Sequence, residues 1–371
     1  MRFCLPANFK INEIEKYKLF ESLHKGNFIE EVYGSINCGS PIGSGRGVLL
    51  NENYGLQNLK EYIAELHKNQ IKFNYTINAS CIGDVEMNDE GISLIIEFIE
   101  LLLEQQVDKL TISSPFLIEL IGKKFPEVII TASSIMNINS LKKAKWIRNL
   151  GASTIALPEE LSRKIPLMES INKIRDIKTE VIINTMCLYN CPYKNFHYNS
   201  LSHMKDVREF MEYYTYSCSY IKNSSVEEYL KMPWIRPEDI KIYEEIGVDY
   251  FKIIGRERVQ KMNLLKMLQY YCMRQYEGNL LELIYGFSKS EKYRVYIDNK
   301  MLDGYIHKFK EKDICEGMCE YKNCTYCKEY TKKAIHIMSR SPINEKKKIN
   351  NFLEYGTIDD FDEERCICGL L

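Results

Sequence analysis

Two cysteines and a histidine follow an apolar, β-branched segment near the middle of the chain. Residues Glu180–Asn184 predict a buried strand, and Cys187, Cys191 and His197 come just past its end. Folds that alternate strands and helices present their chemistry at the carboxyl ends of the strands, and clustered thiols favour metal ligation. We therefore predict a thiol-based site here, and the rest of the chain has to position it.

The spacing of the first two cysteines is C-x3-C, and the nearest further thiol in sequence is Cys218. A radical-SAM motif would continue with a third cysteine at position 194, which is Lys194 instead. A cluster would need a fourth ligand from another loop at the same end of the fold. Cys81 is the preferred candidate and Cys38 the alternative; packed thiols without a metal are the competing hypothesis.

A second group of cysteines lies near the C-terminus, with the spacing C-x3-C-x4-C-x2-C. Its members are Cys315, Cys319, Cys324 and Cys327. The C-x4-C-x2-C part has the spacing of plant-type ferredoxins, which indicates an iron–sulfur centre. Four thiolates also suit structural zinc, so both metals remain open at this stage.

Candidates for proton transfer and anion binding lie around the same predicted strand ends. His197 is preferred over His203 as a proton donor or acceptor, because it is nearer the cysteines. Arginines and a lysine in these loops would bind a carboxylate or phosphate. The main candidates are Arg236, Lys252 and Arg256, with Arg46, Asn78, Glu86 and Arg258 as further polar residues.

Composition narrows the class of protein. The 371 residues carry a formal net charge of −1, so no global basic field points to nucleic acid. The sequence shows neither a secretory leader nor an apolar run long enough to span a bilayer, and we expect a soluble, cytoplasmic protein without membrane contact. In that compartment, thirteen cysteines favour metal ligation over a disulfide framework.

Eight short apolar segments alternate with helical ones, which predicts a TIM-like (β/α)8 barrel over residues 1–276. A small Cys-rich appendage is expected at 277–334, followed by a polar tail at 335–371. The predicted strands are Phe3–Pro6, Glu31–Gly34, Phe73–Asn78, Lys109–Ser113, Val128–Ser133, Thr154–Leu157, Glu180–Asn184 and Asp249–Ile254.

The segment VIINTMCLYNCPYKNFHYN, the following Cys218 and the block WIRPEDIKIYEEIGVDYFKIIGRER resemble the collagenase-like U-32 peptidase family over roughly residues 1–275. The resemblance implies a [4Fe–4S] cluster on four cysteines, here matching Cys187, Cys191 and Cys218. It also implies oxygen-independent hydroxylation of RNA or a quinone precursor, with prephenate as the oxygen source. The spacing of the cysteines departs from that pattern, and the C-terminal group suggests a second cluster for electron delivery.

Three functions follow as hypotheses. The first is an iron–sulfur enzyme that hydroxylates RNA, a peptide or a small molecule, working with an electron donor or a related protein. The second is a peptidase, although the sequence has no G-x-S-x-G or H-E-x-x-H motif, and only Cys187 with His197 offers a nucleophile and base. The third is a non-enzymatic maturation partner that binds a peptide or RNA.

Overall fold

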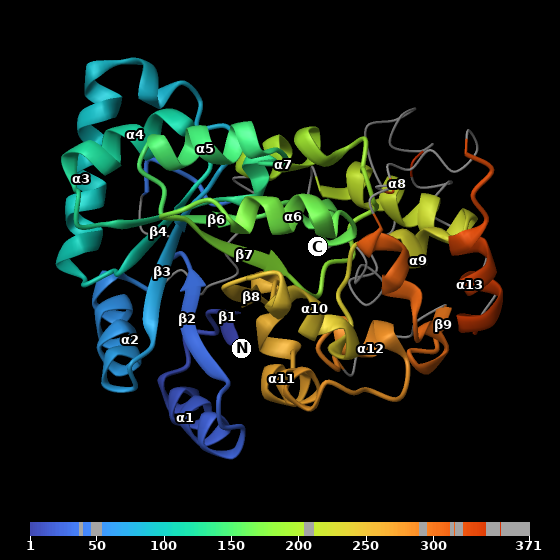
Figure 1. The fold of residues 1–371 in the computed structure, drawn as a ribbon. Coiled ribbons are helices and arrows are strands. Elements are labelled where there is room, and N and C mark those ends of the chain that lie inside the picture. The colour runs from blue at the N-terminus through green and yellow to red at the C-terminus, as the bar shows by residue number, and fades with distance from the viewer. Residues whose placement is uncertain are drawn as a thin grey trace.

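A computed structural model places eight parallel strands in a closed barrel, which confirms the TIM-like fold (Figure 1). It describes residues 1–36, 40–45, 54–203, 211–288, 295–311, 315, 322–338 and 349. The strands pair in chain order, and β1 closes the barrel by pairing with β8. They are β1 (Arg2–Pro6), β2 (Phe28–Gly34), β3 (Lys72–Ile77), β4 (Lys109–Ile112), β5 (Ile129–Ala132), β6 (Thr154–Ala156), β7 (Lys178–Ile182) and β8 (Tyr250–Lys252).

The helices pack their apolar faces on the barrel. In α2 the buried Leu59, Ile63 and Leu66 recur at helical spacing, as the sequence predicts. The helices are α1 (Ile14–Leu23), α2 (Leu56–Lys68), α3 (Asp89–Glu104), α4 (Pro115–Lys124), α5 (Leu141–Asn149), α6 (Ile165–Asn172), α10 (Ile240–Glu245), α11 (Leu264–Met273) and α12 (Leu280–Ile284). Among the described residues, no helix is both long and apolar enough to cross a membrane.

The long connection between β7 and β8 carries the predicted cysteine segment. Its described helices are α7 (Lys194–Ser202), α8 (Met211–Ser224) and α9 (Glu228–Lys231). In Figure 1 this insertion lies at one side of the barrel, and the C-terminal elements lie beside it. Cys187 and Cys191 precede α7, while Cys218 belongs to α8.

Two predicted boundaries are wrong. The seventh strand runs from Lys178 to Ile182 rather than to Asn184, because the Asn184 side chain bonds the backbone of Ile254 outside the ladder. The sequence pattern also predicts a continuous helix at 259–276. Instead a short 3₁₀ segment precedes α11, which begins afresh where the Asn263 side chain accepts a hydrogen bond from the backbone N–H of Lys266.

The C-terminal elements pack against the barrel. They include β9 (Val295–Ile297), α13 (Tyr326–Ala334) and β10 (Ile335–Ile337), and β10 pairs with β9. The first three residues of the expected polar tail therefore form a strand. The buried Arg163 guanidinium, which follows β6, lies 4.4 Å from the Trp234 ring and 5.4 Å from that of Tyr305. These contacts join the appendage to the barrel through one continuous core.

Candidate functional site

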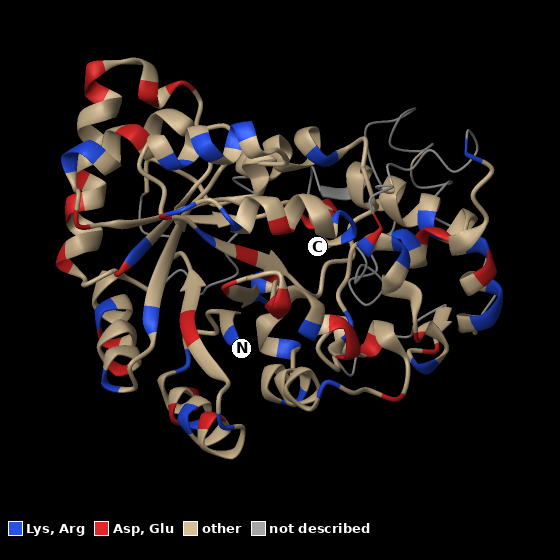
Figure 2. Cartoon of the chain, in the orientation of Figure 1, with Lys and Arg blue, Asp and Glu red and all other residues tan. Residues whose placement is uncertain are grey.

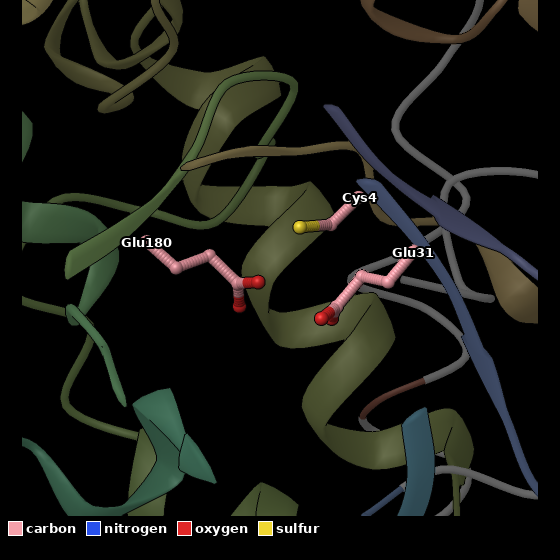
Figure 3. A group of neighbouring side chains, drawn as sticks. All are labelled: Cys4, Glu31 and Glu180. Carbon is pink, nitrogen blue, oxygen red and sulfur yellow. The ribbon is translucent and has the colours of Figure 1, made fainter. Parts of the chain in front are cut away.

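Two lysine–glutamate pairs fill the barrel interior. Lys109 bonds Glu31, and Lys252 Nζ lies 2.7 Å from Glu180 Oε1, with all four side chains buried. The Cys4 thiol lies beside both carboxylates, and the three groups point toward one another (Figure 3). Their ligand atoms lie within 4.8 Å of one another, which would suit a metal ion. The two ammonium groups already neutralise the carboxylates, so we interpret this group as structural.

The electrostatics of this interior follow from burial and pairing. Burial alone would raise the pKa of Glu31, but Lys109 and Lys252 outweigh it and hold that pKa below its ordinary value. Burial would lower the pKa of Lys109, and Glu31 reverses that effect and raises it. Burial raises the pKa of the Cys4 thiol, and both carboxylates raise it further. Cys4 therefore stays a neutral thiol beside two ion pairs.

A pocket opens above this layer, at the carboxyl ends of the strands, and is called the mouth below. Arg256 lines it, and its guanidinium donates hydrogen bonds to the hydroxyl of Thr76 and, at 2.8 Å, to that of Ser44. Lys252 and Asn78 also line the mouth. The predicted Arg46 lies outside the described residues. Hydroxyl partners orient a guanidinium without adding negative charge, which suits the binding of a carboxylate or phosphate.

The mouth also holds an acid that the sequence analysis missed. Glu159 follows β6, is 4% exposed and lines the mouth together with Tyr198. Lys194 Nζ lies 2.6 Å from Glu159 and 2.9 Å from Glu160. The Tyr198 hydroxyl donates to Glu159 at 3.4 Å. The signal available in the sequence was the position of Glu159 directly after a predicted strand.

His197 is not among the residues that line the mouth. It lies on α7 next to Tyr198, and neighbouring residues of a helix point about 100° apart. Its ring stacks on Tyr214 of α8, with centroids 5.7 Å apart. The helix therefore directs Tyr198 to the mouth and His197 toward the α7–α8 contact.

Arg236 is also not among the residues that line the mouth. Carboxylates surround its side chain instead. Its fully buried guanidinium is 2.7 Å from Asp303, 3.3 Å from Glu238 and 3.8 Å from Asp239. Burial raises the pKa of Asp239 to about 6, although Arg236 and Arg163 pull it down. These contacts tie the β7–β8 connection to the C-terminal segment.

Two of the predicted cluster ligands, Cys191 and Cys218, lie near each other at the rim. Cys187 and Cys191 lie in the loop after β7, and both are half-buried, as is Cys218. Burial raises the pKa of the Cys191 thiol, and the nearby Cys218 adds to the rise. The ring of Tyr193 contacts that of Tyr214, 6.1 Å away and one helical turn before Cys218. The loop and α8 thus face each other through their cysteines.

The surroundings of these thiols fit an anionic cluster. Lys222, one turn after Cys218 on the same face of α8, is 1% exposed and donates to the Met186 carbonyl, next to Cys187. An iron–sulfur cluster with thiolate ligands carries negative charge, and nearby cations and hydrogen bonds tune it. The buried Lys222, one helical turn after Cys218, would supply a positive charge that balances the cluster.

Arg258 adds a second buried cation near the same loop. Within the described residues, its three guanidinium nitrogens are buried without a hydrogen-bond acceptor, and the group lies 4.7 Å from the Tyr285 ring. Ile284, beside Tyr285, accepts a hydrogen bond from Asn184, which is three residues before Cys187. A buried cation without acceptors is costly, and an anionic group on this side would offset that cost.

The structure places Cys81 apart from the other three predicted ligands. The preceding residue, Ser80, bonds Ser202 and Asn199 at the C-terminal end of α7. Cys191 lies at the N-terminal end of that helix, and nine residues at about 1.5 Å per residue separate the ends by about 12 Å. The alternative ligand, Cys38, lies outside the described residues.

The C-terminal cysteines are spread out, as far as the structure describes them. Cys324 is exposed, whereas the buried Cys327 thiol lies 3.2 Å from the Tyr305 hydroxyl. Cys315 is half-buried, and Cys319 lies outside the described residues. In the described chain no three thiols lie within 4.8 Å, whereas tetrahedral zinc would hold them about 3.8 Å apart. Metal binding by this group stays a prediction.

Comparison with known proteins identifies the family to which this chain is similar. The model of the family described as "Peptidase family U32" matches residues 29–274. A relative from Methanocaldococcus jannaschii, named "Uncharacterized protease MJ1657", is 32% identical over 342 residues, which is 90% of this chain and 98% of the relative. The structure of the U32 peptidase Mk0906 aligns with a TM-score of 0.51 and 13% identity, covering 69% of this chain and 93% of that one. This structural likeness supports the fold.

Breaking one interior ion pair should destabilise the barrel. Lys109→Met leaves the buried Glu31 without its closest cation, and we expect the free energy of unfolding to fall by about 3–5 kcal/mol. The double variant Lys109→Met/Glu31→Gln should recover most of that loss. Chemical denaturation measures both, and equal losses in the single and double variants would contradict the pairing.

Asp239 should make stability depend on pH. Its folded pKa of about 6 exceeds the unfolded value of about 3.9. Its stabilising contribution is therefore present below the unfolded pKa and lost as pH rises through the folded pKa. Relative to Asp239→Asn, the wild type should lose about 3 kcal/mol of unfolding free energy between about pH 3.5 and pH 7. Urea unfolding at both pH values tests this, and a pH-independent difference would contradict it.

Proposed function

The chain belongs to peptidase family U32, and on that premise we propose that it is an iron–sulfur-dependent redox enzyme acting on an anionic substrate. The observation that supports the proposal is the approach of Cys218 to Cys191, which lies four residues after Cys187, at the rim of the barrel. The same connection supplies Tyr198 to the mouth, so the thiols and the substrate pocket share one structural unit. The reduced cytoplasm would keep these thiols available.

Arg256 would bind and orient the substrate. Its hydroxyl partners Ser44 and Thr76 hold the guanidinium at the mouth, where it can meet a carboxylate. Lys252 lies deeper in the same pocket and contributes positive potential while bonded to Glu180. The pocket lies between the strand ends, which favours a small anionic molecule as the bound co-substrate. Prephenate is the molecule that the family resemblance implies.

Glu159 and Tyr198, which also line the mouth, would accept and donate protons. The carboxylate is fixed by Lys194, and the phenol donates to it, so a proton can pass between the two groups. This is the role that the sequence analysis expected of His197. A bound iron–sulfur cluster would supply an electron carrier or Lewis acid beside these groups.

Hydroxylation without oxygen is the specific reaction we propose, with RNA, a peptide or a small molecule as acceptor. Such a hydroxylation oxidises the acceptor by two electrons, which the compound that donates the oxygen or a partner protein would take up. Figure 2 shows basic and acidic residues intermingled along the outer helices. This mixture supports a local contact with a partner or substrate rather than binding through a broad basic surface.

Peptide hydrolysis is the second candidate, because the family and the archaeal relative carry protease names. A cysteine nucleophile is normally activated by a neighbouring base. The base available to Cys187 would be His197, whose ring stacks on Tyr214 of α8. Turnover of gelatin or a peptide library by iron-free protein would favour hydrolysis over the redox function.

Removing the rim thiols should remove the cluster. For Cys187→Ala and Cys191→Ala, prepared without oxygen, we expect loss of iron, sulfide and visible absorption, because each variant removes a ligand. Cys272→Ala, which alters a half-buried thiol on α11, is the matched control. Wild-type iron content in both rim variants, or a colourless wild type that carries only zinc, would contradict the redox proposal.

Replacing Arg256 should weaken anion binding. Arg256→Gln keeps hydrogen-bonding capacity but removes the charge, and we expect the affinity for prephenate to fall by about 10- to 100-fold. Arg274→Gln, which alters an exposed arginine paired with Glu244, is the control. Calorimetric titration into full-length protein measures both, and equal affinity in the Arg256 variant and the wild type would remove this residue from the site.

A further inference from the structure

The C-terminal segment reaches the loop that carries the rim thiols. Tyr189 lies midway between Cys187 and Cys191, and its hydroxyl donates a 2.6 Å hydrogen bond to the carbonyl of Cys315. These residues are more than 120 positions apart in sequence. This bond brings the backbone at Cys315 within reach of a side chain of the loop.

Cys315 is held there from a second side. Its side chain is half-buried and packs against the hydrophobic core. Cys315 is thus held on one side by the loop that carries the rim thiols and on the other by the hydrophobic core.

The other cysteines are less suited to complete the rim site. Cys81 is tied to the far end of α7 through Ser80. Of the described C-terminal cysteines, Cys324 is exposed and Cys327 faces Tyr305. Cys315, by contrast, is bonded through its backbone carbonyl to Tyr189 of the loop that contains Cys187 and Cys191.

We propose that Cys315 is the fourth ligand of the cluster held by Cys187, Cys191 and Cys218. The inference rests on the iron–sulfur function proposed above and specifies its ligand set. The site would then be closed by the C-terminal segment rather than by the strand loops of the barrel. The protein would then retain the cluster only while that segment is docked, because the segment supplies the fourth thiolate.

Iron and sulfide counts on anaerobically prepared, full-length protein test the ligand set. We expect Cys315→Ala to lose most of its iron and sulfide, whereas Cys81→Ala and the control Cys272→Ala keep the wild-type amounts. Wild-type content in Cys315→Ala overturns the inference and leaves the proposed function standing. A wild type without iron and sulfide overturns both.

A second measurement does not depend on the folding of any variant. Metal-free wild-type protein is treated with dibromobimane, which links neighbouring thiols, and the joined peptides are identified by mass spectrometry. A link between Cys315 and Cys187, Cys191 or Cys218 supports the shared site. Links of Cys315 to other C-terminal cysteines alone, or no link from Cys315, overturn it.

Discussion

The interior of the barrel excludes water, so the charges placed there have to neutralise one another. Glu31 with Lys109 and Glu180 with Lys252 meet this constraint with four ionised groups from four different strands. A lysine left alone at this depth would lose its proton or destabilise the fold. The register of the strands therefore has to bring each lysine beside its glutamate. They also form the floor on which the mouth is built.

Lys252 connects this floor to the pocket above it. The lysine bonds Glu180 inside the barrel and also lines the mouth, 4.1 Å from the ring of Tyr33. Four residues later in the same chain segment, Arg256 reaches Ser44 and, in β3, Thr76. Positive charge and the carboxylate of Glu159 thus line the same mouth. A pocket with both would orient an anionic molecule and leave an acid–base group beside it.

The connection between β7 and β8 gathers the remaining parts of the candidate site. It carries three thiols, the buried Lys222 and the mouth residue Tyr198 on one continuous stretch of chain. The C-terminal segment packs on this connection through Arg163, Trp234 and Tyr305. The appendage also reaches the loop that carries Cys187 and Cys191, through the hydrogen bond from Tyr189 to the Cys315 carbonyl.

The sequence by itself determined the architecture and the position of the main site. Apolar segments of strand length, separated by helical ones, predict eight strands, and all eight form, because backbone periodicity is a local property. Cys187 and Arg256 follow strands β7 and β8 and therefore lie at the carboxyl end of the barrel, as the sequence predicts. Only the tertiary structure decided which side chains work together. The burial of Arg236 among carboxylates, the choice of Tyr198 over His197 and the approach of Cys315 to Tyr189 depend on contacts between distant segments. One sequence without an alignment contains no local signal for such contacts.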